Sequence, residues 1–445
     1  MKLDTLIRGG TLIDPVSGTE TRTDLGIVDG RVAWIGNGAT AAGRILDATG
    51  LLVAPGFVDT HTHDEELNNP GPIQRALLLQ GITTAIAGNC GLGPLIDRYE
   101  PLRRTPLLKL AYLTGHTMLR QEVGIVDTYR PATAEETERM QALLRSELAR
   151  GSFGLSFGLE YAPNTSPAEI DALASLLTGM PERFISVHIR FDGPECLAGI
   201  REVIDIAKRF KVRLQVSHIG SMTAFGFCRQ AVALIEAAKS DGVDLGFDCY
   251  PYDAFCTMIG SAVFDPGFEQ RWNKGLADLE VATGCYKGSR LNPESYAELR
   301  ANDPDALIIA HVMNDQEIRE CLAHPSCAIA TDALLRNGEG HPRAAGTFPR
   351  ALRILREAGL SWPEALRHAT SLPAAMTWLD AGRLVPGTPA DIVVFDPLSL
   401  RDKATFADQL APPEGIHYVF IDGTVAVDHG TIAARPSGRL LFRSS

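Results

Sequence analysis

The sequence predicts an α/β protein, a (β/α)8 barrel with a small β-sandwich domain built from both chain ends. Strand-like apolar runs alternate with helical stretches through the middle of the chain, and eight such runs can be counted. This alternation predicts a parallel sheet whose chemistry sits at the carboxyl ends of the strands. The length of 445 residues fits a barrel with one smaller domain appended.

Both chain ends have the pattern of short strands separated by tight turns. Residues 1–52 alternate apolar runs with Gly and Asp turns, and the pattern returns over 381–445, for example around Asp422-Gly423. Neither end has enough apolar residues for a robust core of its own. We therefore expect the two ends to pair in one small β domain.

The central residues 53–380 carry the predicted TIM barrel. Its strands are expected to end near eight residues: His63, Cys90, His116, Tyr161, His188, His218, Tyr250 and Asp332. Helical patterns occupy four intervening ranges: 134–150, 167–179, 195–210 and 228–240. The stretch 253–310, rich in Gly, Pro and Asn, is too long for an ordinary connection, and we expect it to form a lid or a subdomain.

Composition and charge limit the classes of function. Apolar residues make up 45% of the chain and charged residues 22%, which is ordinary for a globular protein. The net charge of −12 disfavours nucleic acid as a partner, because phosphate binding needs a basic surface. The sequence shows no signal-peptide pattern, no bilayer-spanning stretch and no CxxC pair. We expect a cytoplasmic protein without membrane association, and the oligomeric state stays open.

The segment His61-Thr62-His63 ends an apolar run that begins at Leu51. Alternate residues of a strand point the same way, so the two imidazoles should converge on one point. Neutral imidazole is the commonest nitrogen donor for zinc-like ions. Two histidines satisfied by ordinary hydrogen bonds would give the same pattern, so the segment alone leaves both interpretations open.

Three further potential donors each end a strand of their own. Cys90 follows the second predicted strand, and His188 and His218 follow two adjacent ones. Each alone would suit a structural role, since cysteine is among the most buried residue types. Together they form a Cys-His-His set with one open position, the composition of catalytic zinc sites. His61 and His63 would then hold a second metal position, with the cysteine sulfur able to bridge both.

Asp332 ends the eighth predicted strand, after the run 327–331. A carboxylate near a metal can take a proton from water, whose pKa the ion lowers to about 7. An isolated aspartate at a strand end often caps a helix instead. Because the other strand ends carry potential ligands, we predict that Asp332 is the general acid/base and also faces the metal.

These motifs resemble the amidohydrolase superfamily and, within it, the N-acyl-D-amino-acid deacylase (D-aminoacylase) family. The resemblance rests on GFVDTHTH at 56–63, GNCG at 88–91, the two isolated histidines and the late aspartate. Two segments support the narrower family: GLEYAP at 158–163 and HPRAAGTFPR at 341–350. The resemblance extends from the first strand to Asp396, over nearly the whole chain.

For the metals, the resemblance implies that Cys90, His188 and His218 hold one tight Zn²⁺. It also implies that His61 and His63 contribute to a weaker second site. Many amidohydrolases bridge two metals with a carboxylated lysine, but no lysine stands at a matching strand end here. Cys90 would take that role.

For the reaction, the resemblance implies hydrolysis of the amide bond of N-acyl-D-amino acids, which releases a carboxylate and a D-amino acid. Asp332 would be the catalytic acid/base, and Tyr161, Tyr250 and Arg343 would contact the substrate. The expected partner is a small molecule with a free carboxylate, which Arg343 would grip in a bidentate pair. Without the resemblance, an arginine in a Gly- and Pro-rich segment would be expected in solvent.

Three departures from the family pattern concern the loop after Asp332, the residue Asp253 and the inserted stretch 253–310, and the last two leave the preferred side chain undetermined. Asp332 lies in Ala-Thr-Asp-Ala instead of Ser-Asp-Gly, and Asp253 stands where relatives commonly have threonine. One alternative function is a cyclic amide hydrolase of the hydantoinase or dihydroorotase type, which usually carries the bridging lysine. The other is a non-catalytic binding protein on the same fold, which would be expected to have lost ligands.

Overall fold

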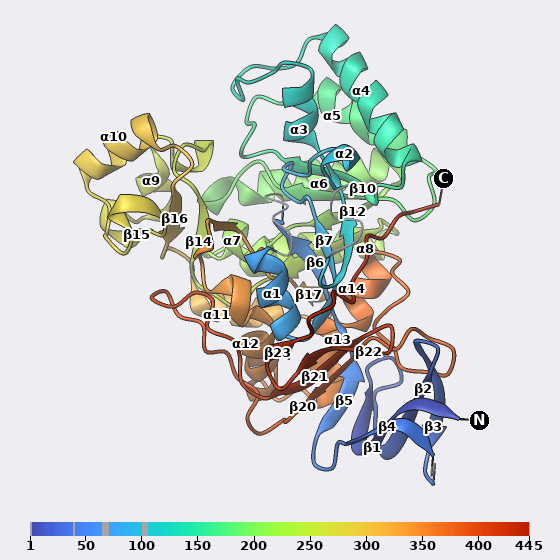
Figure 1. Cartoon of the computed structure of the whole chain (residues 1–445). Coiled ribbons are helices and arrows are strands. Elements are labelled where there is room, and N and C mark those ends of the chain that lie inside the picture. The colour runs from blue at the N-terminus through green and yellow to red at the C-terminus, as the bar shows by residue number, and fades with distance from the viewer. Residues whose placement is uncertain (1, 39–40, 65–70, 100–105, 445) are drawn as a thin grey trace.

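The structure is a computed structural model that describes residues 2–38, 41–64, 71–99 and 106–444. It confirms the predicted α/β class (Figure 1). A barrel of parallel strands is surrounded by helices, and a mixed sheet built from both chain ends lies against one side of it. No helix in this described part of the chain is both long enough and apolar enough to cross a bilayer.

Eight strand positions form the barrel. In chain order they are β6 (Phe57–Thr62), β7 (Ile82–Ala87), β8 (Lys109–Tyr112) continued by β9 (Thr114–Gly115), β10 (Gly154–Gly158), β11 (Phe184–His188), β12 (Arg213–Val216), β13 (Leu245–Cys249) and β17 (Cys327–Ile329). Neighbouring strands pair in parallel. The ring closes after β17, where the amide of Asp332 donates a 2.8 Å hydrogen bond to the carbonyl of His61. The eight strands end close to the predicted positions.

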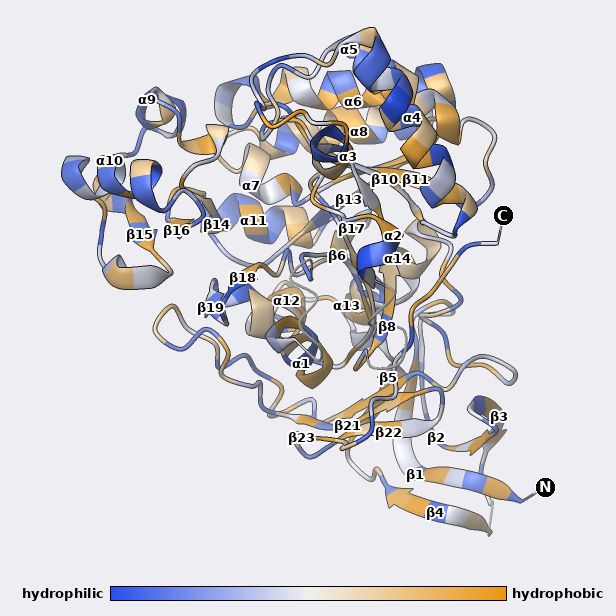
Figure 2. Cartoon of the chain, turned by 45° about the horizontal axis from the view of Figure 1, so that its top comes forward, coloured by the Kyte–Doolittle hydropathy of each residue, from blue (hydrophilic) through white to orange (hydrophobic). Residues whose placement is uncertain are grey.

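The helices between the strands agree with the sequence pattern. The four predicted ranges correspond to α4 (Ala134–Ala149), α5 (Pro167–Ala174) with a 3-10 turn (Ser175–Leu177), α6 (Cys196–Phe210) and α8 (Cys228–Ser240). In α6 the buried residues Ile200, Val203, Ile206 and Ala207 recur at helical spacing, so one face packs on the barrel. Helices such as α4 carry hydrophilic residues on the outside (Figure 2).

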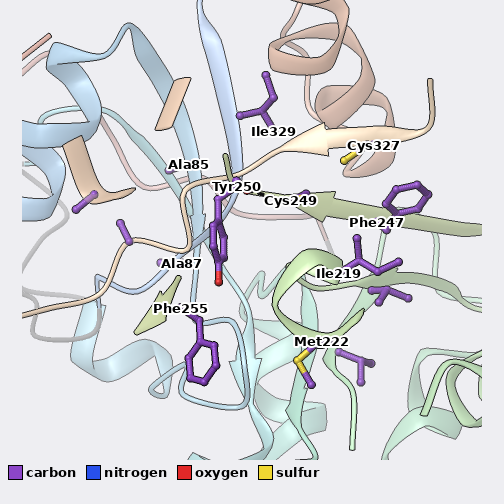
Figure 3. Packing of buried hydrophobic residues seen from close by; sticks show 14 of the residues in the cluster. Ala85, Ala87, Ile219, Met222, Phe247, Cys249, Tyr250, Phe255, Cys327 and Ile329 are labelled. Carbon is purple, nitrogen blue, oxygen red and sulfur yellow. Dashed lines mark hydrogen bonds between the residues drawn. The ribbon is translucent and has the colours of Figure 1, made fainter. Parts of the chain in front are cut away.

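The remaining helices complete the outer layer and the strand ends. They are α1 (Pro72–Leu79), α2 (Ile96–Tyr99), α3 (His116–Glu122), α7 (Ile219–Thr223), α11 (Asp315–Leu322), α12 (Arg343–Glu357), α13 (Trp362–Ala369) and α14 (Ser371–Met376). Between the barrel strands and the surrounding helices, apolar side chains from separate strands pack together. Figure 3 shows part of this core, with Ala85 and Ala87 from β7, Phe247 from β13 and Ile329 from β17.

The two chain ends pair in one nine-stranded mixed sheet, as expected. Its strands are β1 (Leu3–Asp14), β2 (Thr19–Val28), β3 (Arg31–Gly36), β4 (Ala42–Asp47), β5 (Leu52–Pro55), β20 (Ile392–Phe395), β21 (Ile416–Ile421), β22 (Thr424–Asp428) and β23 (Thr431–Ile432). The ends meet where β20 pairs antiparallel with β5. The last residues leave this sheet and follow β8, because the amide of Leu441 donates to the carbonyl of Leu110. The exact domain boundaries stay a prediction.

The long stretch before the last barrel strand forms a subdomain with its own sheet (Figure 1, yellow). Its strands are β14 (Phe255–Met258), β16 (Leu307–Ala310) and β15 (Leu279–Val281), antiparallel in that order, with helices α9 (Phe268–Trp272) and α10 (Pro293–Asn302). The rings of Phe255, Phe264, Phe268 and Trp272 meet in tilted and edge-to-face contacts and form a small aromatic core. This core fixes β14 beside the ends of the barrel strands.

Candidate metal centre

The barrel brings the six predicted ligands to one rim. His61 lies in β6 and His63 just after it, Cys90 follows β7, His188 ends β11, His218 follows β12 and Asp332 follows β17. All six are buried, with Asp332 the most exposed at 6%. Because parallel strands of a barrel end at the same face, residues up to 271 positions apart meet here.

Two groups of these side chains are arranged so that they could hold a metal ion, and Cys90 belongs to both. One group consists of His61, His63, Cys90 and Asp332, and the other of Cys90, His188 and His218. Within each group the donor atoms lie within 4.8 Å of one another. The Sγ of Cys90 lies 3.4 Å from Nε2 of His61 and 3.4 Å from Nε2 of His218. These groups coincide with the two metal positions expected from the sequence, while the roles of the single residues stay predictions.

Three of these residues have left-handed backbone conformations. The φ angles are 53° for Cys90, 33° for His218 and 49° for Asp332. Side chains other than glycine adopt this region at a cost, and such residues concentrate at functional sites. The turn at Cys90 is also tightly packed, because a Cβ added to Gly158 would lie 2.1 Å from the Cys90 carbonyl oxygen. The fold therefore holds these side chains in place against local backbone preference.

Hydrogen bonds orient the imidazole rings. Nδ1 of His218 lies 2.8 Å from Oγ of Ser221, which leaves Nε2 toward Cys90. Nε2 of His188 lies 2.9 Å from Oε2 of Glu160, and its buried Nδ1 has no hydrogen-bond partner among the described residues. A ring whose other nitrogen is fixed in this way presents a defined lone pair to a metal. His188 would therefore ligate through Nδ1 and His218 through Nε2.

The electrostatics of the centre favour a cation. Burial would raise the pKa of the Cys90 thiol, but His61 and His218 hold it well below its ordinary value. Burial would likewise raise the pKa of Asp332, but Arg343 and His218 lower it well below its usual range. Two anions are thus buried side by side, which is the charge arrangement that a divalent metal stabilises.

The histidines respond to the same negative charge. Burial would lower the pKa of His61, but the neighbouring Cys90 and Asp332 raise it to about 10. Burial would also lower the pKa of His188, but Cys90 and Glu160 raise it to about 9. Protons on these rings would compensate the buried anions, and a metal ion would replace them, since metal ligands bind in the deprotonated form. The donor set therefore fits zinc in both chemistry and charge.

A pocket opens beside the centre and includes two of the three predicted substrate contacts. It is lined by His188, His218 and Asp332 together with Tyr161 and Arg343. The hydroxyl of Tyr161 lies 3.0 Å from Oγ1 of Thr257. None of the described residues that line the pocket is a lysine.

Arg343 is buried. The Gly- and Pro-rich composition of its segment alone would instead predict an arginine in solvent. It is the first residue of α12 and is 2% exposed. Its Nη1 lies 2.8 Å from Oδ2 of Asp332, and Nη2–H donates a 3.1 Å hydrogen bond to the carbonyl of Cys256. Its guanidinium lies 4.8 Å from the ring centroid of Tyr250. Tyr250 thus packs against Arg343 and is not among the described lining residues.

The inserted subdomain forms part of the pocket wall. Phe255, Cys256 and Thr257 of β14, together with Val263, face the same pocket as the barrel ligands. Figure 3 shows Tyr250 with its hydroxyl directed toward Phe255. The stretch 253–310 is therefore a component of the site as well as a subdomain.

Sequence reasoning missed several polar groups beside the ligands. Oδ1 of Asp248 accepts a 2.7 Å hydrogen bond from the backbone amide of His218 and lies 3.7 Å from Nδ1 of His61. Its strand position two residues before Tyr250 puts both side chains on one face, a signal that the sequence contained. Glu160 belonged to the GLEYAP segment, but its contact with His188 depends on the neighbouring strand.

The comparisons with known proteins agree with this geometry. The model of the Amidohydrolase family matches residues 228–427. The chain is 32% identical to N-acyl-D-glutamate deacylase from Alcaligenes xylosoxydans xylosoxydans, covering 100% of this chain and 97% of the relative. It is 32% identical to D-aminoacylase of the same organism, over 99% of this chain and 98% of that relative. It is 33% identical to N-acyl-D-aspartate deacylase of the same organism, over 98% of this chain and 95% of that relative.

The chain belongs to the N-acyl-D-amino-acid deacylase (D-aminoacylase) family of amidohydrolases. It also superimposes on the crystal structure of N-acyl-D-glutamate deacylase from Bordetella bronchiseptica, with a TM-score of 0.89, 30% identity and 100% of both chains covered. That structure contains zinc and a phosphonate inhibitor that mimics the tetrahedral intermediate. Like the other members of its family, the chain is a metal-dependent amidohydrolase.

Proposed function

We propose that this deacylase hydrolyses the amide bond of N-acyl-D-amino acids with zinc held at the centre around Cys90. One observation carries the proposal: Cys90 is shared by two donor groups, and Asp332 of one group is paired with the buried Arg343. The centre thus combines metal ligands, an acid/base and a cation for a carboxylate within one pocket. The full-length similarity to deacylases supports the choice of substrate.

In this proposal, Cys90, His188 and His218 hold one tight zinc ion. His61, His63 and Asp332, together with the Cys90 sulfur, contribute a weaker second position. When bound, zinc supplies Lewis acidity, which polarises the scissile carbonyl and lowers the pKa of water to about 7.

All eight cysteines are unpaired, which supports the expected location in the reducing cytoplasm.

Asp332 is assigned the proton transfers. Its Oδ1 lies 3.0 Å from Nε2 of His63, and its Oδ2 faces Arg343, so the carboxylate has a fixed orientation toward the pocket. Held ionised by these neighbours, it can accept a proton from the attacking water. It then returns the proton to the leaving nitrogen, which departs as the amine of the D-amino acid.

We assign to Arg343 the binding of the substrate carboxylate. Its guanidinium offers a planar fork that matches a carboxylate, and burial strengthens such a pair by excluding water. Tyr161 lines the same pocket, and Tyr250 supports the guanidinium from one face. A carboxylate held here would fix the amide bond relative to Asp332.

The test is a turnover screen of the purified, zinc-loaded chain against paired D and L series of N-acetyl amino acids. We expect turnover of the D series and bound zinc by elemental analysis. Dihydroorotate and hydantoins in the same screen test the cyclic amide alternative. Preferential hydrolysis of either cyclic substrate, or of the L series, would contradict the proposal.

A further inference from the structure

We infer that the substrate pocket accepts uncharged D-amino-acid side chains and discriminates against the anionic side chains of D-glutamate and D-aspartate. The inference rests on the proposed deacylase function and deepens it by naming the substrate class. It differs from what the names of two relatives would suggest, since these act on N-acyl-D-glutamate and N-acyl-D-aspartate.

The pocket wall carries two buried carboxylates in addition to Asp332. Glu160 and Asp192 line the pocket and are 5% and 2% exposed. Nε of Arg271 lies 2.7 Å from Oδ1 of Asp192, and its Nη2 lies 3.7 Å from Oε1 of Glu160. The indole N–H of Trp272 donates a 2.5 Å hydrogen bond to Oδ2 of Asp192. One guanidinium therefore stands between two carboxylates, and we term this group the acidic wall (Glu160, Asp192 and Arg271). Burial raises the pKa of Asp192 to about 7, so Asp192 is mostly ionised at pH 8 and adds negative charge to the wall.

The other cation of the pocket is already engaged. Arg343 pairs with Asp332 and is the proposed partner of the substrate's α-carboxylate. Among the described residues that line the pocket there is no further lysine or arginine. The lining also includes the apolar residues Met222, Phe255 and Val263 and the uncharged polar residues Ser221 and Thr257. Figure 3 shows Phe255 below the Tyr250 hydroxyl, with Met222 to the right of Phe255 in this view.

A second carboxylate on the substrate would therefore enter a water-poor pocket next to like charge. Repulsion between unit charges a few ångströms apart is large where water is excluded, so the anionic side chain should lose about tenfold or more in kcat/KM against an uncharged one of the same shape. An apolar or amide side chain meets no such repulsion and gains contact with the apolar residues. The pocket thus selects by charge more than by length.

The experiment compares isosteric substrate pairs on the full-length, zinc-loaded protein at pH 8. We expect kcat/KM for N-acetyl-D-glutamine to exceed that for N-acetyl-D-glutamate by about tenfold or more, and the asparagine and aspartate pair to show the same order. N-acetyl-D-methionine should be hydrolysed at least as well as the amides. Equal or faster hydrolysis of the acidic member of either pair would overturn the inference.

Two variants should change the ratio of kcat/KM for N-acetyl-D-glutamine to kcat/KM for N-acetyl-D-glutamate in opposite directions. Asp192→Asn removes negative charge from the acidic wall and should lower this ratio at least severalfold. Arg271→Gln removes the compensating cation and should widen it. Glu269→Gln, on the same helix α9 but outside the pocket lining, is the matched control and should leave the ratio unchanged. Ratios that respond in the reverse sense would overturn the inference.

Binding measurements separate this inference from the proposed function. Calorimetric titration of the Asp332→Asn variant with the same four compounds measures the side-chain preference without turnover. If the wild-type protein hydrolyses none of the compounds, the proposed deacylation fails, and the binding ratio still decides the side-chain preference. Tighter binding of the acidic member of each pair would contradict the inference, whatever the outcome for turnover.

Discussion

Nη1 of Arg343 lies 2.8 Å from Oδ2 of Asp332, so the proposed carboxylate-binding group is paired with the proposed acid/base. Both side chains are buried, at 2% and 8% exposure. A substrate carboxylate that shares Arg343 would weaken its hold on Asp332 and raise the proton affinity of that carboxylate. With these proposed roles, substrate binding and proton transfer would be coupled through this contact.

Asp332→Asn should lower kcat about 100-fold or more, because an amide cannot accept the proton of the attacking water. The measurement is steady-state turnover of an N-acetyl-D-amino acid, with bound zinc determined in the same samples. Asp253→Asn is the control, since Asp253 is exposed and is not among the described lining residues. Activity of the Asp332 variant within tenfold of the wild type would refute the assignment.

Arg343→Lys should reduce kcat/KM about 10- to 100-fold, because lysine keeps the charge but loses the bidentate geometry. The effect should depend on the substrate carboxylate. We therefore compare N-acetyl-D-methionine with its C-terminal amide: the wild type should discriminate strongly between them, and the variant should discriminate much less. Equal discrimination by both proteins would show that Arg343 does not bind the carboxylate.

Cys90→Ala should abolish tight zinc binding, since Cys90 belongs to both donor groups. Elemental analysis after gel filtration gives the stoichiometry, and circular dichroism checks that the barrel is intact. Cys285→Ala is a matched control, because Cys285 is the exposed cysteine and lies in the subdomain. Unchanged zinc content in the Cys90 variant would rule out its proposed role as the shared ligand.

A buried ion pair away from the centre should make stability depend on pH. Burial would raise the pKa of Glu169, but the hydrogen bond with His116 and the charges of His116 and Arg120 lower it to about 2. Oε1 of Glu169 lies 2.8 Å from Nε2 of His116 and 2.7 Å from Nη1 of Arg120. His116 therefore has a structural role in this pairing, and it is not among the described residues that line the pocket.

Because its folded-state pKa is lowered, ionised Glu169 stabilises the fold above its unfolded pKa of about 4.5, and this stability is lost as the pH falls toward 2. Glu169→Gln should cost about 2–3 kcal/mol of unfolding free energy at pH 7, and less as the pH falls below 4.5. Urea denaturation at several pH values measures the difference, with exposed Glu138→Gln as control. A cost that does not change with pH would contradict the ion-pair explanation.

The sequence by itself predicted the barrel, the candidate ligands and the resemblance to the family. Period-two alternation placed His61 and His63 on one face, and helical spacing predicted α6 and α8 nearly to the residue. The ligands could be found because each ends an apolar run, and parallel strands of a barrel all end at one rim, whatever their separation along the chain. Such patterns are local in the sequence, and the barrel fold brings the residues that carry them close together.

Only the tertiary structure decided which side chains touch. The contact of Glu160 with His188, the burial of Arg343 beside Asp332 and the part of β14 in the pocket wall depend on the paths of loops and of the inserted subdomain. The run of the C-terminal residues along β8 was likewise not visible in the sequence. Loop paths follow from packing between distant segments, and no periodic pattern records them. The charge of the pocket wall, and with it the expected choice of substrate, belongs to this second class.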